Sequence, residues 1–325
     1  MNELARRFIN RYQGGFPLEE FPFASVAAEF GVSGDELIGL IGDLLHQGLL
    51  SRFGPLYDAC CMGGSITLAA LSVPEDRYEL VTEIVNALPE VAHNYRREHR
   101  LNMWFVIATE SPDMLQQALI KIEQEANLPV YNFPKLQTFY LGLWLQIDED
   151  GGISTVPVPG PLKQGGMIID DLDRSIVRNT QAGMPLQTAP YSVIAESCGS
   201  DTATVIERMQ RMLDCGVIRR IGAIPNHYRL GLSANGMSVW DVEDGKLLEL
   251  GARLGRLEFV SHCYERPRHE PLWPYNLFAM IHGHDRDEVL EKLEQIARLL
   301  GNSCRRHEVL FSTRILKKTG LRLVA

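Results

Sequence analysis

The chain lacks long apolar runs and cysteine motifs. Its apolar stretches are far shorter than the roughly 20 residues that a membrane helix needs, and residues 1–13 show no continuous apolar stretch typical of a secretion signal. The six cysteines form no CxxC pair, no spaced zinc set and no CxxCH haem-attachment motif. We therefore expect no membrane segment, reduced and mostly buried thiols, and a cytoplasmic location.

The chain also has fewer basic than acidic residues. The chain has 32 Lys and Arg against 41 Asp and Glu, a formal net charge of −9, and an acidic protein repels nucleic acid unless a local basic patch compensates. Otherwise the composition is ordinary for a soluble globular protein, with 325 residues that are 45% hydrophobic and 22% charged. This length accommodates two domains, each with its own core.

The two halves of the chain repeat each other. At an offset of 168 residues, the apolar, glycine and arginine positions of residues 31–54 return in residues 199–222, which indicates an internal duplication. Between the copies, residues 148–167 are rich in Gly and Pro and show neither a helical nor an alternating pattern. This composition predicts a linker.

Each copy begins with a predicted winged helix-turn-helix. Helical patterns cover residues 2–12, 24–30 and 34–47 in the first copy and 170–180, 192–198 and 202–215 in the second. Gly48 and Gly216 follow the longest helices as C-terminal caps. Short β runs at residues 49–55 and 217–225 then end in a glycine turn. This is the order of a winged helix-turn-helix.

The rest of each copy follows the order β-α-β-β-α-β. The predicted elements are residues 65–72, 75–87, 92–100, 102–109, 112–126 and 136–145, and then 233–242, 245–254, 259–268, 275–282, 286–300 and 309–316. This order predicts a ferredoxin-like antiparallel sheet with helices on one face, so the fold class is α+β. The expected domains are 1–57 (winged helix-turn-helix), 58–147 (ferredoxin-like), 148–169 (linker), 170–228 (winged helix-turn-helix) and 229–325 (ferredoxin-like).

A cluster of His, Tyr and Arg recurs in the middle of each ferredoxin-like domain. HNYRREHRLNMWF (residues 93–105) returns as HCYERPRHEPLWPYNLF (residues 262–278), with a longer loop in the second copy. Alternation along the predicted strand places His93, Tyr95, Arg97 and His99 on one face. Cationic donors, a neutral-pH proton carrier and flat apolar faces together suit a large planar ligand that carries carboxylates. We expect the pocket where the two halves meet, with unequal contributions from the two copies.

The helix in the DNA-recognition position argues against DNA binding. Residues 34–47 carry Asp35, Glu36 and Asp43 but no Lys or Arg, and residues 202–215 balance two arginines with two acidic residues. Phosphate contacts require cations on this helix. We therefore expect the helix-turn-helix to serve as a scaffold or a dimer surface.

The chain resembles the Lrp/AsnC regulators in its module order and the siroheme decarboxylases in its central motifs, specifically their fused two-domain form. The motifs that carry the resemblance extend over nearly the whole chain. They are RFGPLYD (52–58), PEVAHNYRREHRLNMWF (89–105), RRIGAIPNHYRLG (219–231), VSHCYERP (260–267), WPYNLFAMIHG (273–283) and FSTRILKKTG (311–320).

The resemblance implies a carboxy-lyase, siroheme decarboxylase. Such an enzyme removes the acetate carboxylates at C12 and C18 of siroheme and gives 12,18-didecarboxysiroheme and two CO2, on the route to the dioxo-haem cofactor of cytochrome cd nitrite reductase. Siroheme carries eight carboxylates, so its pocket needs cations for its edges and flat side chains for its faces. No cofactor beyond the substrate is expected, since its own ring accepts the electrons of the breaking bond.

The recurring cluster supplies candidates for each role. We expect general acids or proton relays at His93, Tyr95, His99, His262 and Tyr264. We expect substrate binding by Arg97, Asn102, Trp104, Arg266, Arg268, Trp273, Tyr275 and Asn276. We expect no protein metal site, although a histidine could ligate the substrate iron. The basic tail 311–325, with Arg314, Lys317, Lys318 and Arg322, is interpreted either as a contact to the ligand rim or as a solvated strand.

Two other functions are kept as alternatives: an Lrp/AsnC-type transcriptional regulator, and a haem sensor or carrier without chemistry. The expected partners are siroheme and didecarboxysiroheme, with no DNA and no membrane. A homodimer and an assembly with other haem-biosynthesis proteins are both left open.

Overall fold

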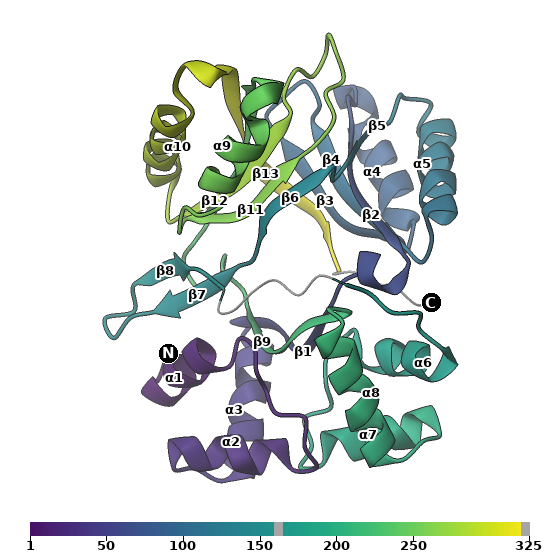
Figure 1. The fold of residues 1–325 in the computed structure, drawn as a ribbon, viewed down its shortest axis with the longest axis vertical. Coiled ribbons are helices and arrows are strands. Elements are labelled where there is room, and N and C mark those ends of the chain that lie inside the picture. The colour runs from purple at the N-terminus through teal and green to yellow at the C-terminus, as the bar shows by residue number, and fades with distance from the viewer. Residues whose placement is uncertain (159–164, 320–325) are drawn as a thin grey trace.

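The computed structural model describes residues 1–158 and 165–319. It has two parts, stacked along the long axis of the molecule (Figure 1). One part is a nine-stranded sheet with helices on its outer side, and the other holds the two helix-turn-helix units around a two-stranded sheet. In the part of the chain that the structure describes, no helix is long and apolar enough to cross a membrane.

The two helix-turn-helix units form as the sequence predicts. The first comprises α1 (Glu3–Arg11), α2 (Pro22–Phe30) and α3 (Gly34–His46), and the second comprises α6 (Asp171–Thr180), α7 (Pro190–Cys198) and α8 (Thr202–Asp214). Ser33 and Glu36 form a capping box at the start of α3. Gly48, with a φ of 70°, follows the end of this helix, where a left-handed residue is favoured.

The strands that follow these helices pair with each other and join the two units. β1 (Leu50–Tyr57) and β9 (Ile218–Pro225) are antiparallel, with Gly54 opposite Gly222. The prediction that these glycines form turns is wrong, because both lie inside the strands. At Gly222 a Cβ atom would lie 2.3 Å from the carbonyl oxygen of Tyr12, so the close approach of two backbones, not a turn, requires the glycine.

The nine-stranded sheet combines the strands of both ferredoxin-like domains. The first copy contributes β2 (Ser65–Leu71), β3 (Val91–Arg97), β4 (Met103–Thr109), β5 (Tyr131–Pro134) and β6 (Gln137–Leu141). The second contributes β10 (Ala234–Val242), β11 (Val260–Glu265), β12 (Leu277–Gly283) and β13 (Cys304–Lys318). The strand order is β5-β2-β4-β3-β13-β10-β12-β11-β6. Within each copy, the order of a ferredoxin-like sheet is therefore confirmed.

The last strands also pair across the copies, an arrangement called the strand exchange below. β13 of the second copy pairs with β10 of its own copy and with β3 of the first, and β6 of the first copy pairs with β11. The expectation of one last strand at residues 136–145 is wrong, because this region divides between β6 and the start of β7 (Trp144–Ile147). β7 pairs with β8 (Ile153–Val156), so part of the predicted linker is a hairpin. The exchange places strands from both copies on either side of the recurring cluster.

Helices cover one face of the sheet and apolar side chains fill its two cores. α4 (Tyr78–Ala87) and α5 (Pro112–Ala126) pack on the first copy, and α9 (Leu247–Leu254) and α10 (Arg286–Leu300) pack on the second (Figure 1). On the opposite face, aromatic side chains from both copies form a third cluster around Trp104, Phe133 and Trp273. This shared cluster fixes the two halves of the sheet against each other.

Candidate active site

The recurring cluster lies on the face of β3 opposite to its helices. Arg96 and Asn94 turn toward the helices, where Arg96 stacks on Tyr78 and Asn94 bonds to Asn86. His93 and Tyr95 therefore project from the other face, with ring centroids 6.2 Å apart, and the Arg97 guanidinium lies 5.7 Å from the Tyr95 ring. The predicted alternation is confirmed for these residues.

The second copy repeats this arrangement on β11. The His262 and Tyr264 rings are 6.0 Å apart, and the Arg266 guanidinium lies 5.0 Å from the Tyr264 ring. The Lys135 ammonium adds a second cation 5.4 Å from the same ring. The structure thus contains two His-Tyr-Arg sites of the same geometry, named here the first-copy site and the second-copy site.

Each site is completed by the other copy. Arg97 donates from Nη1 to the carbonyl oxygen of Leu310 on β13 at 2.5 Å, and Arg266 donates to that of Phe133 on β5. Across the exchanged strands, Lys318 stands opposite His93 and Leu141 stands opposite His262. Neither half of the chain therefore builds its own site alone.

Burial controls the protonation of both sites. Desolvation, with Lys318 as the second cause, lowers the pKa of His93 to about 4. Desolvation, with the nearby charges of His282 and Arg219, lowers the pKa of His262 to about 3. Burial likewise raises the pKa of Tyr95 to about 12. At neutral pH the histidines are therefore neutral and the tyrosine keeps its proton.

Several buried polar atoms of the sites lack partners. Among the described residues, His93 Nδ1, Arg97 Nε, Arg266 Nε and Ser312 Oγ have no hydrogen-bond partner. Burial lowers the pKa of Arg97 and of Arg266 to about 10, which still leaves both guanidiniums charged at neutral pH. Unsatisfied buried donors are costly, so they indicate a site shaped for a polar ligand. The sites contain more cationic than acidic side chains, which favours an anionic ligand.

The structure brings in residues that the sequence did not point to. Tyr228 affects the pKa of Tyr95 and Arg97, and Lys318 lies 4.6 Å from its ring. Lys318 belongs to the basic tail, so its interpretation as a ligand contact fits its place beside His93, whereas Arg322 lies outside the described residues. Tyr228 lies in residues 219–231, one of the motifs that carry the family resemblance. Because this motif lies outside both His-Tyr-Arg runs, it was the sequence signal for Tyr228.

His227 and His282 also lie at the second-copy site. Their rings are 5.1 Å apart, and His282 shares the Ser261 hydroxyl with His262.

His99 lies elsewhere. The prediction that it shares the strand face with His93 is wrong, because β3 ends at Arg97. The chain turns after this residue, and the His99 ring packs 5.2 Å from Trp273 while its Nε2 lies 3.5 Å from Glu308. His99 therefore belongs to the aromatic cluster between the copies.

The remaining predicted binding residues are engaged in structure. Asn102 and Asn276 bond through both side-chain atoms to the backbone of Val73 and Val242, at 2.8–3.0 Å. Arg268 pairs with Asp241 and Asp244. Trp104 and Trp273 are 0% exposed, and Tyr275 donates to Glu308. These side chains support the sheet and leave few free groups for a ligand.

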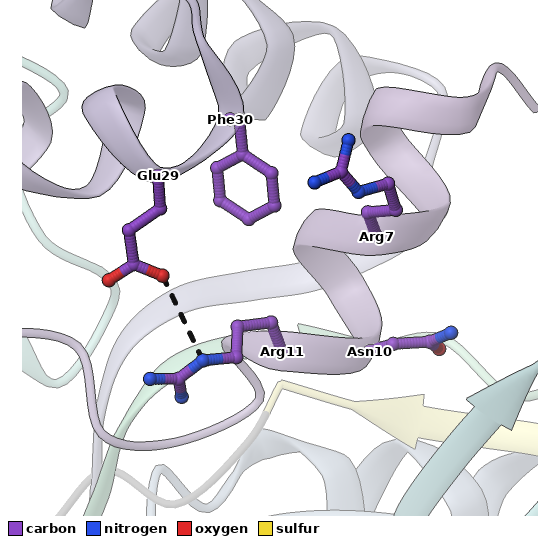
Figure 2. Close-up of a pocket in the computed structure, with 5 residues that line it drawn as sticks. All are labelled: Arg7, Asn10, Arg11, Glu29 and Phe30. Atoms are coloured by element: carbon purple, nitrogen blue, oxygen red, sulfur yellow. Dashed lines mark ion pairs between the residues drawn. The ribbon is translucent and has the colours of Figure 1, made fainter.

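A separate hollow lies on the first helix-turn-helix unit. Figure 2 shows the side chains of α1 and α2 around it, with Arg11 and Glu29 paired at 3.9 Å. Arg7, Asn10 and Phe30 complete its lining, and no residue of either His-Tyr-Arg site reaches it. Among the described residues, no cluster of His, Cys, Asp and Glu has the arrangement of a metal site. The two His-Tyr-Arg sites thus remain the candidates for chemistry.

Comparisons with known proteins agree on one family. A family described as "Siroheme decarboxylase NirDL-like HTH domain" matches residues 5–50 and 173–219, and an "AsnC-like ligand binding domain" matches residues 62–139 and 229–317. The siroheme decarboxylase of Hydrogenobacter thermophilus is 31% identical over 322 residues, covering 97% of this chain and 93% of that protein. The chain belongs to the siroheme decarboxylase family.

Two further members are similar to this chain. The siroheme decarboxylase NirH subunit of Paracoccus pantotrophus is 56% identical over 154 residues, which are 47% of this chain and 96% of that protein. The solved structure of the siroheme decarboxylase NirDL in complex with an iron-uroporphyrin III analogue has a TM-score of 0.74 and 28% identity, and covers 100% of this chain and 95% of that one. The duplicated α+β fold expected from the sequence is thereby confirmed.

Proposed function

We propose that the protein is a carboxy-lyase that removes the acetate carboxylates at C12 and C18 of siroheme, giving 12,18-didecarboxysiroheme and two CO2. The observation that carries this proposal is the pair of equivalent His-Tyr-Arg sites, each completed by a strand of the other copy. Two sites of one geometry on one sheet suit a substrate that loses two equivalent groups. Family membership and the porphyrin analogue bound by a solved relative support the same substrate class.

The cations of the sites hold the substrate carboxylates. Arg97 and Lys318 at one site, and Arg266, Lys135 and Arg219 at the other, supply positive charge near the histidines. A charged hydrogen bond to a carboxylate contributes about 1.5–3 kcal/mol. The unpartnered Nε atoms of Arg97 and Arg266 gain partners in the same step.

Each decarboxylation consumes one proton. The bond between the acetate methylene and its carboxylate breaks, CO2 leaves, and a new C–H bond forms from that proton. Transient protonation of the adjacent ring lets the macrocycle accept the electron pair, so we propose no cofactor beyond siroheme. His93 and His262 are the proposed proton donors, and Tyr95 and Tyr264 are the alternative donors. A bound carboxylate would favour the protonated histidine and so prepare it to donate.

The family comparison also supports a proposal about assembly. Relatives named as NirH and NirG subunits cover about half of this chain, and a relative that covers 98% of it is itself named a NirDL subunit, so we propose that the protein works with a further siroheme decarboxylase subunit. We also propose a cytoplasmic location, supported by cysteines that are all free among the described residues. A role in DNA binding has less support, because Arg208 and Arg211 of α8 pair with Asp170 and Asp173.

Anaerobic incubation with siroheme, followed by mass spectrometry, tests the activity. We expect the loss of two CO2 units, and a double variant His93→Gln with His262→Gln that keeps its circular dichroism spectrum should abolish it. Binding of siroheme without any change in its mass, in the presence of a NirH-type subunit as well as alone, would instead support a haem carrier. Measuring the turnover with and without that subunit also tests the proposed assembly.

A further inference from the structure

The second-copy site contains a buried chain of hydrogen bonds that ends at His262. Ser261 Oγ lies 2.7 Å from His262 Nδ1 and 2.6 Å from His282 Nε2. On the other side of its ring, His282 Nδ1 bonds to Asn235 Oδ1. Ser261, His282 and Asn235 are each 5% exposed or less, so water competes little for these bonds.

A β-bulge makes this chain possible. Neighbouring residues of a strand normally point to opposite faces, yet Ser261 and His262 share a hydrogen bond between their side chains. The pairing of β11 with β12 shifts register between Val260 and His262, which leaves Ser261 as the extra residue. Bulges re-aim side chains in this way, often beside functional sites.

The direction of each bond follows from the chemistry of its atoms. An amide oxygen only accepts, so His282 donates from Nδ1 to Asn235. Among the described residues, the Asn235 amide nitrogen is buried without a hydrogen-bond partner, so Oδ1 is the Asn235 atom that the chain engages. A neutral His282 then accepts at Nε2 from the Ser261 hydroxyl. The Ser261 oxygen is left to accept from His262 Nδ1.

The first copy has no counterpart of this chain. The strand registers make Ser261 equivalent to Ala92 and His282 equivalent to Ala108. Asn235 is likewise equivalent to Ile66 on β2. In agreement, His93 Nδ1 is buried without a partner among the described residues, whereas His262 Nδ1 is bonded. Since the same fold accepts apolar residues at these positions, folding does not require the polar chain.

We propose that Ser261, His282 and Asn235 are positioning residues that hold His262 as its Nδ1–H tautomer, so that the proton it gains and gives to siroheme sits on Nε2. A histidine whose one nitrogen is held by a hydrogen bond presents the other nitrogen in a defined state. His93 lacks this control, so the two sites are unequal in their chemistry. This inference rests on the proposed function for its role in turnover, and its structural part stands on the ligand-free protein.

Nitrogen NMR of the ligand-free full chain, labelled at histidine, tests the structural part without any substrate. We expect His262 with a protonated Nδ1 and an unprotonated Nε2 at pH 7.5, and loss of this single tautomer in Ser261→Ala. The variant Ser261→Thr keeps the hydroxyl and should restore the wild-type signals. An Nε2–H tautomer in the wild type, or an unchanged tautomer in Ser261→Ala, would overturn the proposal.

Steady-state turnover of siroheme by the full chain, with its partner subunit if that is required, tests the functional part. We expect Ser261→Ala and His282→Ala to lower kcat by roughly 10- to 100-fold with little change in KM, which is typical when the support of a reacting histidine is lost. The matched control is His284→Ala, because His284 is exposed and pairs only locally with Glu288. Equal kcat in wild type and Ser261→Ala would refute the role. An inactive wild type with the expected NMR tautomer would refute the proposed function and leave the positioning intact.

Discussion

Binding of a polycarboxylate should be accompanied by uptake of protons at the two histidines. His93, with a pKa of about 4, and His262, with a pKa of about 3, are neutral in the free protein at pH 6 and above. A carboxylate placed about 4 Å from an imidazolium contributes about 4 kcal/mol at the effective dielectric constant of protein sites. Since one pKa unit corresponds to about 1.4 kcal/mol, this raises each pKa by about three units.

The shift predicts a measurable pH dependence of binding. In the complex, His93 should titrate near pH 7 and His262 near pH 6, by the same order-of-magnitude calculation. Lowering the pH from 8 to 6 then strengthens binding about tenfold through His93 and about twofold through His262. Over this range the carboxylates of the ligand stay mostly ionised, so they contribute little to the change.

Isothermal titration calorimetry with an iron-uroporphyrin III analogue measures the uptake directly, since the observed heat depends on the ionisation enthalpy of the buffer. We expect between one and two protons at pH 6 and less than half a proton at pH 8, by the same calculation. His93→Gln should remove most of the pH dependence of the affinity, whereas the exposed His284→Gln serves as the unchanged control. Heats that are independent of the buffer at pH 6 would refute the assignment of the histidines as the groups that meet the carboxylates.

Three further outcomes follow from the structure. Lys135→Met should weaken binding of the same analogue by about 10- to 100-fold, the value of one charged hydrogen bond, while Lys121→Met, which removes an exposed pair with Glu125, should not, as a fluorescence titration would reveal. Asn276→Ala should lower the free energy of unfolding by about 2–4 kcal/mol, because two buried hydrogen bonds to Val242 are lost; an unchanged urea midpoint would contradict the supporting role. Because burial lowers the pKa of His93 to about 4, mainly the unfolded chain takes up a proton there below pH 6.5, and the free energy of unfolding should fall by up to about 3 kcal/mol as the pH falls toward 4. His93→Gln should reduce this difference between urea titrations at pH 7 and pH 4.5, and an unchanged difference would exclude His93 as its source.

Local patterns in the sequence predicted the elements but not how the copies combine. Helices such as α5 and α10 begin and end where periodicity and capping residues indicate, since those signals lie within a few residues of each other. The pairing of β13 with β3 joins residues more than two hundred positions apart, and no local pattern records it. Gly54 and Gly222 were predicted to form turns for this reason. In a sequence, a glycine that permits close contact of two strands looks the same as a glycine that forms a turn.

For the candidate site, too, local patterns predicted some of the residues but not those that other parts of the fold supply. Alternation along one strand was sufficient to place His93, Tyr95 and Arg97 together. It failed for His99, where the strand had already ended. It also could not find Lys135 or Ser261, since the first lies in the connection between β5 and β6, far from the second copy in sequence, and the second is turned by a bulge. These residues become visible only when the register between strands is known.

The strand exchange joins the two copies at both sites. Two equivalent contacts, the Arg97 bond to Leu310 and the Arg266 bond to Phe133, cross from one copy to the other. The arginine of each site is therefore held by the backbone of the other copy. The hydrogen-bond chain from Asn235 to His262 differs, because Ser261, His282 and Asn235 all belong to the second copy. The copies could thus become different in the protonation of their histidines while remaining alike in how they bind carboxylates.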